Sequence, residues 1–311
     1  QGFLMQSFLV DSSIYIFRSY FTLPNNWKSI DSNYSTNAVY GFTNFLINIL
    51  QQTEPKYIGC AFDESLGTGF RHQMFSDYKA TRELPDDALA YQLKACRQLC
   101  RVMGIFEAAS SIYEADDLIG SMVRTTKMEG MQPVIVSRDK DLMQLIDDDV
   151  LYWDFGKSQP QNKKHLEDKL EIKCSQLADF LALAGDSSDN IPGVDGIGVK
   201  TARQLLSFFS NVESIIEHLD QLEDLPIRGS GKLADKINMS KDQIFLSKQL
   251  ATIVTDIDDG LEVSELVWKG VQMQAFEIFA DEMGFGGSFE SRIARLKQRS
   301  LPQFSSQVIS I

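Results

Sequence analysis

The sequence predicts an α/β layer with a doubly wound parallel sheet, followed by a lobe made of helices. Within the first 155 residues, short apolar runs typical of buried strands alternate with helical patterns. From about residue 175 the strand patterns stop, and helical patterns broken by glycine-rich turns take over. With 311 residues and 43% hydrophobic content, the chain can bury a sizeable core in one large domain or two intimate ones.

Strands are predicted at short apolar runs, and helices where apolar residues recur every three or four positions. The predicted strands are 5–10, 57–62, 104–108, 133–137 and 149–154. The predicted helices of the first part are 13–21, 36–52, 86–102, 114–128 and 139–146. Those of the second part are 175–184, 199–209, 211–219, 231–237, 241–250 and 272–284, and the last dozen residues are predicted to be frayed. Segment 24–35 is predicted to be a polar loop, and 64–85 shows no clear periodicity.

Composition narrows the class of protein. No apolar run approaches the roughly 20 residues of a membrane span, and the N-terminus lacks the pattern of a secretory leader, so a cytoplasmic protein without membrane contact is expected. The cysteines (Cys60, Cys96, Cys100 and Cys174) form no CxxC pair and are predicted to be reduced core thiols. A net charge of −13 argues against a uniformly basic nucleic-acid surface, so any such surface would consist of local basic stripes.

Acidic residues occur where a metal site would need them. Asp11 and Asp63 close predicted strands, and Asp139 follows another. Because the carboxyl ends of parallel strands share one edge of the sheet, these acids should converge. Two carboxylates ~4 Å apart repel by about 4 kcal/mol at an effective dielectric of ~20, so a cluster requires cations or protons. The predicted metal-site residues are Asp11, Asp63, Glu114, Asp116, Asp117, Asp139, Asp141, Asp186 and Asp189.

Oxygen ligands favour a hard cation such as Mg²⁺ or Mn²⁺, and the three histidines show no zinc-ligand spacing. Ordinary explanations remain open for each acidic motif. The acids of 114–117 open a predicted helix and could simply complement its dipole. Those of 139–141 and 185–190 could lie in solvated turns, as is predicted for 147–149 at the opposite edge of the sheet.

Two further patterns suggest contacts with nucleic acid. Gly193, Gly196 and Gly198 precede a predicted helix, where glycines let a backbone approach phosphate closely. Because Val199 separates the last glycine from Lys200, the pattern is not a Walker A loop, and a hairpin gripping a nucleic-acid backbone is favoured over ATP binding. Cations and aromatics are also interleaved at Arg71, Tyr78, Lys79 and Arg82, and at Phe17 with Arg18, although a solvated loop remains an alternative.

Taken together, these motifs resemble the 5′ nuclease domain of bacterial DNA polymerase I and the related flap endonucleases. The resemblance covers roughly residues 7 to 285, and its motifs occur in order and at matching spacing. They are Asp11-Ser12-Ser13 with Phe17-Arg18, Phe62-Asp63, Phe70-Arg71, Tyr78-Lys79 with Arg82, Glu114-Ala115-Asp116-Asp117, Asp139-Lys140-Asp141, the run 185–193 and the run 196–202.

The resemblance implies a PIN-like parallel-sheet nuclease core with a helical arch, and a C-terminal helical lobe with a helix-three-turn-helix that binds duplex and holds K⁺ through backbone carbonyls. The implied domains are a core at 1–174 with its arch at about 64–100, a DNA-binding lobe at 175–290 with the helix-three-turn-helix at about 185–210, and a tail at 291–311.

Site roles are implied residue by residue. The first metal site would use Asp11, Asp63, Glu114, Asp116 and Asp117, directly or through water, and the second would use Asp139, Asp141, Asp186 and Asp189. The residues implied in catalysis are Lys79, Arg82, Asp63, Asp117, Asp139 and Asp186. Those implied in DNA binding are Phe17, Arg18, Arg71, Tyr78, Lys79, Arg82, Gly193, Gly196, Gly198, Lys200 and Thr201.

The predicted function is a divalent-metal-dependent 5′-3′ exonuclease and 5′-flap endonuclease that acts on flapped, nicked or gapped DNA in replication and repair and leaves a 5′-phosphate. A monomer is expected. Two alternatives stay open: a PIN-type ribonuclease, and a non-catalytic module that binds branched DNA. The sequence does not distinguish a free-standing enzyme from the front of a DNA polymerase.

Overall fold

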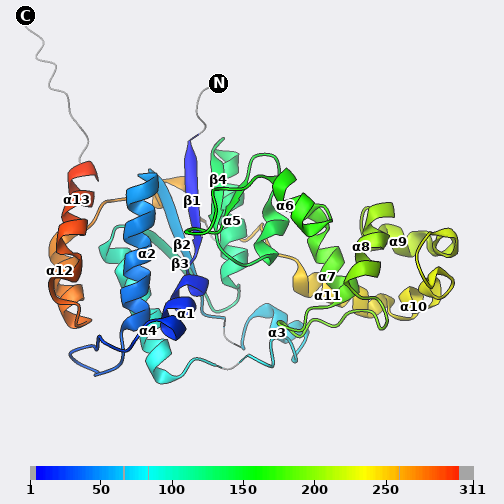
Figure 1. Ribbon diagram of the computed structural model, residues 1–311, viewed down its shortest axis with the longest axis horizontal. Helices are drawn as coiled ribbons and strands as arrows, with labels where there is room; N and C mark the ends of the chain where they lie inside the picture. The colour runs from blue at the N-terminus through cyan, green and yellow to red at the C-terminus, as the bar shows by residue number, and fades with distance from the viewer. Residues whose placement is uncertain (1–4, 66, 83, 259, 301–311) are drawn as a thin grey trace, which may run out of the picture. The chain divides into compact units, whose positions relative to one another are not determined.

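The computed structural model describes residues 5–65, 67–82, 84–258 and 260–300, and among these five strands form one sheet. The strands are β1 (Gln6–Asp11), β2 (Tyr57–Asp63), β3 (Phe106–Ser110), β4 (Gln132–Val136) and β5 (Leu151–Trp153), in the order β3-β2-β1-β4-β5. Figure 1 labels β1, β2, β3 and β4. β1 runs parallel to β4 with Leu9 opposite Ile135, and β4 runs parallel to β5. The doubly wound prediction is confirmed.

The centre of the sheet is fully buried because its strands are continuous apolar runs. Leu9, Val10, Val134, Ile135 and Val136 all have zero exposure. The strand order reverses between β1 and β4, and ligands of open α/β sheets bind at the carboxyl ends next to such a switch point. Asp11 and Asp139 stand at those two strand ends.

The described chain gathers into two compact units that are interleaved in sequence. Unit 1 draws on residues up to 11, 61–84 and 108–261, and unit 2 draws on 12–60, 85–107 and the residues from 262. β2 and β3 each pass from one unit into the other along the chain.

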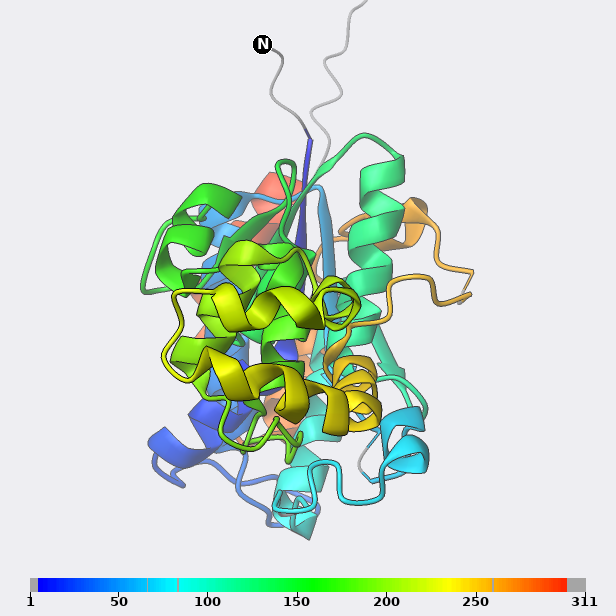
Figure 2. The ribbon, with the colours of Figure 1, turned by 90° about the vertical axis from the view of Figure 1, so that its right-hand side faces the viewer.

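The helices of unit 1 include α5 (Ala115–Met128), which lies against β1 and β4, and those of the C-terminal lobe (Figures 1 and 2). They are α3 (Phe70–Met74), α5, α6 (Lys163–Leu170), α7 (Leu177–Ala184), α8 (Val199–Phe208), α9 (Val212–Glu217), α10 (Leu233–Met239) and α11 (Lys241–Ala251). Short 3₁₀ turns are η1 (Asp141–Leu145), η2 (Cys174–Gln176), η3 (Leu219–Asp224) and η4 (Ser230–Lys232). α5 packs on β1 and β4, while α7 packs on α8 and α11.

Unit 2 is built around helix–helix contacts. Its helices are α1 (Ser12–Thr22), α2 (Asn37–Thr53), α4 (Asp87–Val102), α12 (Met273–Glu282) and α13 (Glu290–Ser300), with 3₁₀ turns η5 (Val263–Leu266) and η6 (Gly286–Phe289). α4 packs on α1, α2 and α12. Gln92 of α4 fixes the start of α2, because its side-chain carbonyl accepts from the Ala38 N–H at 2.7 Å.

Three features differ from the sequence-based expectations. The predicted helix 139–146 is the shorter η1, and α3 and α6 were not predicted. Within unit 2, α4 packs on other helices, and the extent of the arch stays a prediction. α13 occupies part of the predicted tail. Ile293 and Leu296 bury one face of this helix, and Arg292 donates to Asn44 and Asn48. The rest of the predicted tail, 301–311, lies outside the described residues.

All four cysteines are free and buried, as predicted. Across the described part of the chain, every helix is too short or too polar to cross a bilayer.

Candidate active site

The predicted acids come from several segments of unit 1. Asp11 ends β1, Asp63 ends β2, Glu114 caps the N-terminus of α5, and Asp139 follows β4. Asp186 and Asp189 lie on the loop after α7. Parallel strand ends and a helix N-terminus therefore bring carboxylates from distant parts of the sequence to one place.

Burial and nearby acids raise the pKa of two of these carboxyls, Asp116 and Asp63. Burial raises the pKa of Asp116 well above its ordinary value, and the charges of Asp139 and Asp11 raise it further. Burial also raises the pKa of Asp63, with Glu114 as the next contribution. The predicted convergence is thus present, and these groups favour protons or a cation at the site.

Three carboxylates form the tightest group. Asp141, Asp186 and Asp189 each offer an oxygen within 4.8 Å of the other two, which suits a shared cation. Burial, followed by the charges of Asp139, Asp189 and Asp186, raises the pKa of Asp141 to about 7. Such a set is costly near neutral pH unless positive charge is added.

Several neutral residues orient the acids, and sequence reasoning missed them. The Ser137 hydroxyl donates to Asp11 at 2.7 Å and accepts from the Asp139 N–H at 2.9 Å. The Ser65 hydroxyl donates to Asp63 at 3.0 Å. Tyr152 donates to the Asp139 carbonyl at 2.9 Å. A serine two residues from a candidate ligand was the available signal, because short hydroxyl side chains bond local backbone and carboxylates.

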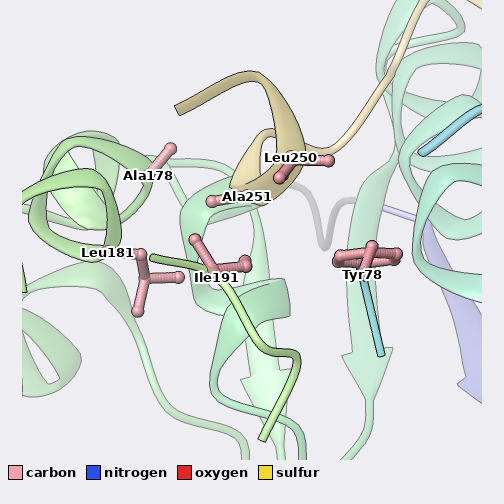
Figure 3. Close-up of a cluster of buried hydrophobic side chains, with 6 residues drawn as sticks. All are labelled: Tyr78, Ala178, Leu181, Ile191, Leu250 and Ala251. Carbon is pink, nitrogen blue, oxygen red and sulfur yellow. The ribbon is translucent and has the colours of Figure 1, made fainter. Parts of the chain in front are cut away.

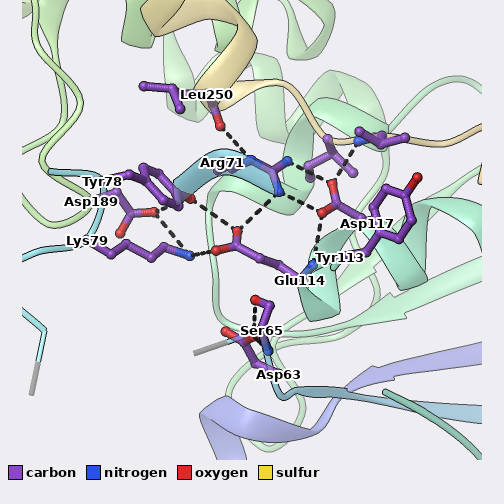
Figure 4. A network of polar contacts seen from close by, with 12 residues as sticks. Asp63, Ser65, Arg71, Tyr78, Lys79, Tyr113, Glu114, Asp117, Asp189 and Leu250 are labelled. Atoms are coloured by element: carbon purple, nitrogen blue, oxygen red, sulfur yellow. Dashed lines mark hydrogen bonds and ion pairs between the residues drawn. The ribbon is translucent and has the colours of Figure 1, made fainter. Parts of the chain in front are cut away.

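Two predicted cations face the acids. Lys79 Nζ lies 2.7 Å from Glu114 Oε1 and 3.6 Å from Asp189 Oδ2 (Figure 4), and Arg82 bonds the other oxygen of Asp189. Burial opposes the charge of Lys79, but Glu114, Tyr78 and Asp189 outweigh it and raise the pKa of this lysine. Lys79 therefore stays charged among the carboxylates.

Arg71 was expected to contact DNA, but the structure buries it. It is 3% exposed and makes a bidentate ion pair with Asp117 at 2.6 and 2.8 Å (Figure 4). Its remaining donors reach the carbonyls of Leu250 and Thr252, each at 2.8 Å. The guanidinium therefore ties α3 to the end of α11 instead of facing solvent.

Asp117 was expected to bind metal, yet both its oxygens are occupied by donors from the chain. Oδ2 also accepts from the Glu114 N–H at 3.0 Å, and Oδ1 from the Val254 N–H at 2.9 Å. The first of these bonds belongs to a capping box, so Asp117 has a structural role at the start of α5. Its geometry favours holding Arg71 over binding a cation.

Tyr78 was also expected to contact DNA and is likewise buried, at 3% exposure. Its ring belongs to a hydrophobic cluster with Ala178, Leu181, Ile191, Leu250 and Ala251 (Figure 3). Its hydroxyl donates to Glu114 at 3.1 Å. Tyr78 thus anchors the segment carrying Lys79 to the helical lobe.

Buried side chains anchor the hairpin that contains the three glycines, and the residues between these side chains are exposed. Ile191, Val194 and Ile197 are buried, whereas Gly196, Gly198 and Lys200 are exposed. Gly198 is the N-cap of α8. The hairpin therefore presents the first N–H groups of α8 to solvent, with Lys200 and Thr201 in its first turn.

The other predicted residues lie elsewhere. Phe17 and Arg18 are on α1 in unit 2, where Arg18 is exposed, and their DNA contacts stay a prediction. In the 147–149 run, Asp147 pairs with Lys127 and Asp148 with Lys163, which fits the predicted solvated turn.

Comparison with known families accounts for most of the chain. Residues 6–173 match the family model of the 5′-3′ exonuclease N-terminal, resolvase-like domain. Residues 172–274 match that of the 5′-3′ exonuclease C-terminal SAM fold. The two matches meet close to the predicted boundary between core and lobe.

Curated relatives are of two lengths. The 5′-3′ exonuclease of Buchnera aphidicola subsp. Schizaphis graminum is 37% identical, with 84% of this chain covering 90% of that protein. DNA polymerase I of Caldicellulosiruptor bescii is 34% identical, with 96% of this chain covering 34% of that protein. The chain therefore spans about a third of the polymerase relatives.

Solved structures share the fold. The phage T5 5′-exonuclease with bound zinc superposes with a TM-score of 0.65 at 20% identity, and 89% of this chain covers 99% of that chain. The catalytic core of Rad2 in complex with DNA substrate superposes with a TM-score of 0.63 at 13% identity, and 94% of this chain covers 92% of that chain. The matches to both family models and to relatives of the same length show that this chain belongs to the 5′-3′ exonuclease family.

Proposed function

We propose that the protein is a structure-specific 5′-3′ exonuclease and 5′-flap endonuclease that hydrolyses DNA phosphodiesters and leaves a 5′-phosphate. The observation that carries the proposal is the gathering of carboxylates from strand ends and the Asp186–Asp189 loop around the partly buried Lys79. This arrangement places anionic metal ligands and a phosphate-binding cation in one site.

The donor set fits divalent cations of the Mg²⁺ or Mn²⁺ type. Asp141, Asp186 and Asp189 would hold one ion, with Asp139 beside them, and Asp11, Asp63, Glu114 and Asp116 would hold another. Bound ions would supply an activated water and stabilise the leaving oxygen of an in-line displacement. The raised pKa of Asp141 and of Asp116 supports this assignment, because cations would offset the burial of these carboxylates and the repulsion between them, which together raise the pKa.

Lys79 and Arg82 would bind the scissile phosphate. Both side chains pair with Asp189 in the structure. On binding, the phosphate would replace Asp189 as the partner of the two cations, and a metal ion would replace the cations beside Asp189. A positioned ammonium stabilises charge that develops on phosphate oxygens. Lys79 is the stronger candidate, because its side chain is 12% exposed whereas that of Arg82 is 51% exposed.

The α8 N-terminus would hold duplex DNA. Its free N–H groups and Lys200 suit a backbone phosphate, and backbone carbonyls of the hairpin would hold K⁺.

The DNA complex of the Rad2 core and the zinc complex of the T5 exonuclease support DNA and divalent metal as partners. If the chain is joined to a polymerase, as in the longer relatives, both activities would act on one substrate. We expect a cytoplasmic monomer.

The test uses end-labelled 5′-flap, nicked, gapped and single-stranded DNA, and single-stranded RNA, each incubated with Mg²⁺, Mn²⁺ or EDTA. Cleavage at the flap junction that requires metal and leaves a 5′-phosphate supports the proposal. Preference for single-stranded RNA would instead identify a ribonuclease, and metal-independent flap binding without cleavage would identify a binding module.

Asp186→Asn is expected to abolish cleavage while flap binding in EDTA is preserved or tightened, because the change removes a metal ligand and a charge that repels phosphate. Asp139→Asn should behave in the same way. Binding by electrophoretic shift and single-turnover cleavage are measured on each variant. Parallel loss of both would show that these acids support folding instead.

A further inference from the structure

We infer that Asn190 is a positioning residue whose side-chain amide locks the turn 77–80 and so aims Lys79 at the carboxylates. The inference rests on the proposed function for its effect on rate. The contacts that carry it involve only unit 1 residues.

The backbone at Lys79 is the first observation. Lys79 has φ of 53°, in the left-handed region that lysine rarely adopts. It is the third residue of a turn closed by the Ala80 N–H, which donates to the Asp77 carbonyl at 3.1 Å. Turns with positive φ at this position usually have glycine or asparagine there. The surrounding structure must therefore hold Lys79 in place.

The loop after α7 supplies that hold from both sides of the turn. The Lys79 N–H donates to the Asp189 carbonyl at 2.9 Å. Nδ2 of Asn190 donates to the Asp77 carbonyl at 2.7 Å. Two consecutive loop residues, Asp189 and Asn190, are thus hydrogen-bonded to the residues on either side of Tyr78.

Hydrogen bonds within the loop brace it as a clamp on the turn. Asp186 and Ile191 exchange two backbone hydrogen bonds, at 2.9 and 2.8 Å. Asn190 has φ of 53°, which asparagine tolerates better than most residues. Because its partner is a carbonyl, this contact requires a hydrogen-bond donor, so neither an ionised aspartate nor an apolar residue can replace the amide.

The clamp affects the site through Lys79. With the turn fixed, Nζ lies 2.7 Å from Glu114 and 3.6 Å from Asp189 (Figure 4). Without the amide, Lys79 can relax to an extended conformation and its side chain leaves this position. Asn190 touches the turn backbone and is not proposed to contact substrate.

The experiment combines Asn190 and Lys79 changes in a double-mutant cycle. Asn190→Gly keeps the positive φ available and removes the amide, and Asn190→Asp keeps the shape and removes the donor. In the wild-type background each should lower the single-turnover flap cleavage rate by about tenfold or more. In a Lys79→Ala background each should change the rate by less than about twofold. Exposed Ser187 of the same loop gives the matched control, and Ser187→Ala should leave the rate unchanged.

A second readout does not depend on cleavage. Hydrogen exchange of the Lys79 amide should accelerate in both Asn190 variants and stay slow in Ser187→Ala, while melting temperature and Mn²⁺ affinity remain near wild type. Equal rate losses in both Lys79 backgrounds, or a parallel loss of Mn²⁺ affinity, would overturn the inference. Unchanged amide exchange would overturn it as well. If the wild-type protein cleaves no DNA, the proposed function fails. The hydrogen-exchange measurement still tests whether Asn190 holds the turn 77–80 in place.

Discussion

Lys79 lies among the carboxylates of the candidate site. Its side chain is 12% exposed and pairs with both Glu114 and Asp189. Lys79→Ala is expected to lower the single-turnover cleavage rate by on the order of 10²-fold, the scale for losing a preorganised charge at an oxyanion. Duplex affinity should change little, because the α8 hairpin is proposed to hold the duplex.

Arg82 offers a graded control for that prediction. Its side chain is 51% exposed, so Arg82→Ala should cost less rate than Lys79→Ala when both are measured by rapid quench on one flap substrate. A wild-type rate in Lys79→Ala would remove this lysine from the mechanism.

The buried pair of Arg71 and Asp117 is expected to matter mainly for folding. Asp117 accepts from Arg71 and from two backbone N–H groups, so its removal leaves a buried guanidinium undercompensated. Asp117→Asn should reduce the free energy of unfolding by on the order of 3 kcal/mol, the scale for breaking a buried ion pair. Chemical denaturation in EDTA measures this change.

Asp186→Asn is the matched comparison, because it also removes one negative charge but from a group of mutually repelling acids. It should leave the metal-free protein as stable as the wild type or more so. Equal destabilisation by the two changes would contradict the distinction between the supporting acid and the metal-site acid. Arg71→Lys should resemble Asp117→Asn, since lysine cannot make the bidentate pair.

At the scale of elements, the three glycines of the hairpin serve different purposes. A Cβ at Gly193 would meet the backbone of Ala184 and Gly185, and Gly196 has φ of +75°. Both are therefore explained by the fold itself. Gly198 differs, because a Cβ there would meet nothing within 4 Å and its φ of −92° suits any residue.

Gly198→Val is therefore expected to lower the melting temperature only slightly, as a change of the N-cap, and to keep the Mn²⁺ affinity, yet to weaken binding to flap and nicked duplexes strongly, because a side chain would block phosphate at the α8 N-terminus. Fluorescence anisotropy measures the affinity. Loss of stability in proportion to loss of binding would show that Gly198 serves only the helix cap. Lys200→Ala in the same assay should lower the slope of log affinity against log salt by about one phosphate contact.

At the scale of the whole molecule, the acidic site links stability to pH. The ordinary aspartate pKa is 3.8, whereas burial and then neighbouring acids raise the pKa of Asp141 to about 7. Asp116 and Asp63 shift in the same direction. Between those values the folded state binds more protons than the unfolded state, so the free energy of unfolding falls as pH rises from about 4 to about 7.

Divalent cations should reverse this trend because they replace the protons. In EDTA, we expect a lower melting temperature at about pH 8 than at about pH 5, and the gain on adding Mg²⁺ should be larger at the higher pH. Calorimetric scans at the two pH values, with and without metal, measure the effect. Asp141→Asn should flatten the dependence, and a pH-independent metal gain would contradict the link.

The sequence by itself determined the strand pattern and the edge at which the acids meet. Leu9, Val10 and Val136 lie in apolar runs that only a sheet covered on both faces can bury, and the ends of parallel strands share an edge. Asp11, Asp63 and Asp139 were therefore predictable by position. The hairpin was predictable as well, because glycines and a following helical pattern are local signals.

Tertiary structure alone decided which polar residues stay exposed and which are buried in support of the fold. Arg71 bonds a carbonyl 179 residues away, and Asn190 reaches one 113 residues away. The positive φ of Lys79 depends on the second of these contacts and on Asp189. Periodicity and residue type carry no information about such pairings, because an arginine beside an aromatic has the same local pattern whether it is solvated or buried against a carboxylate from another segment.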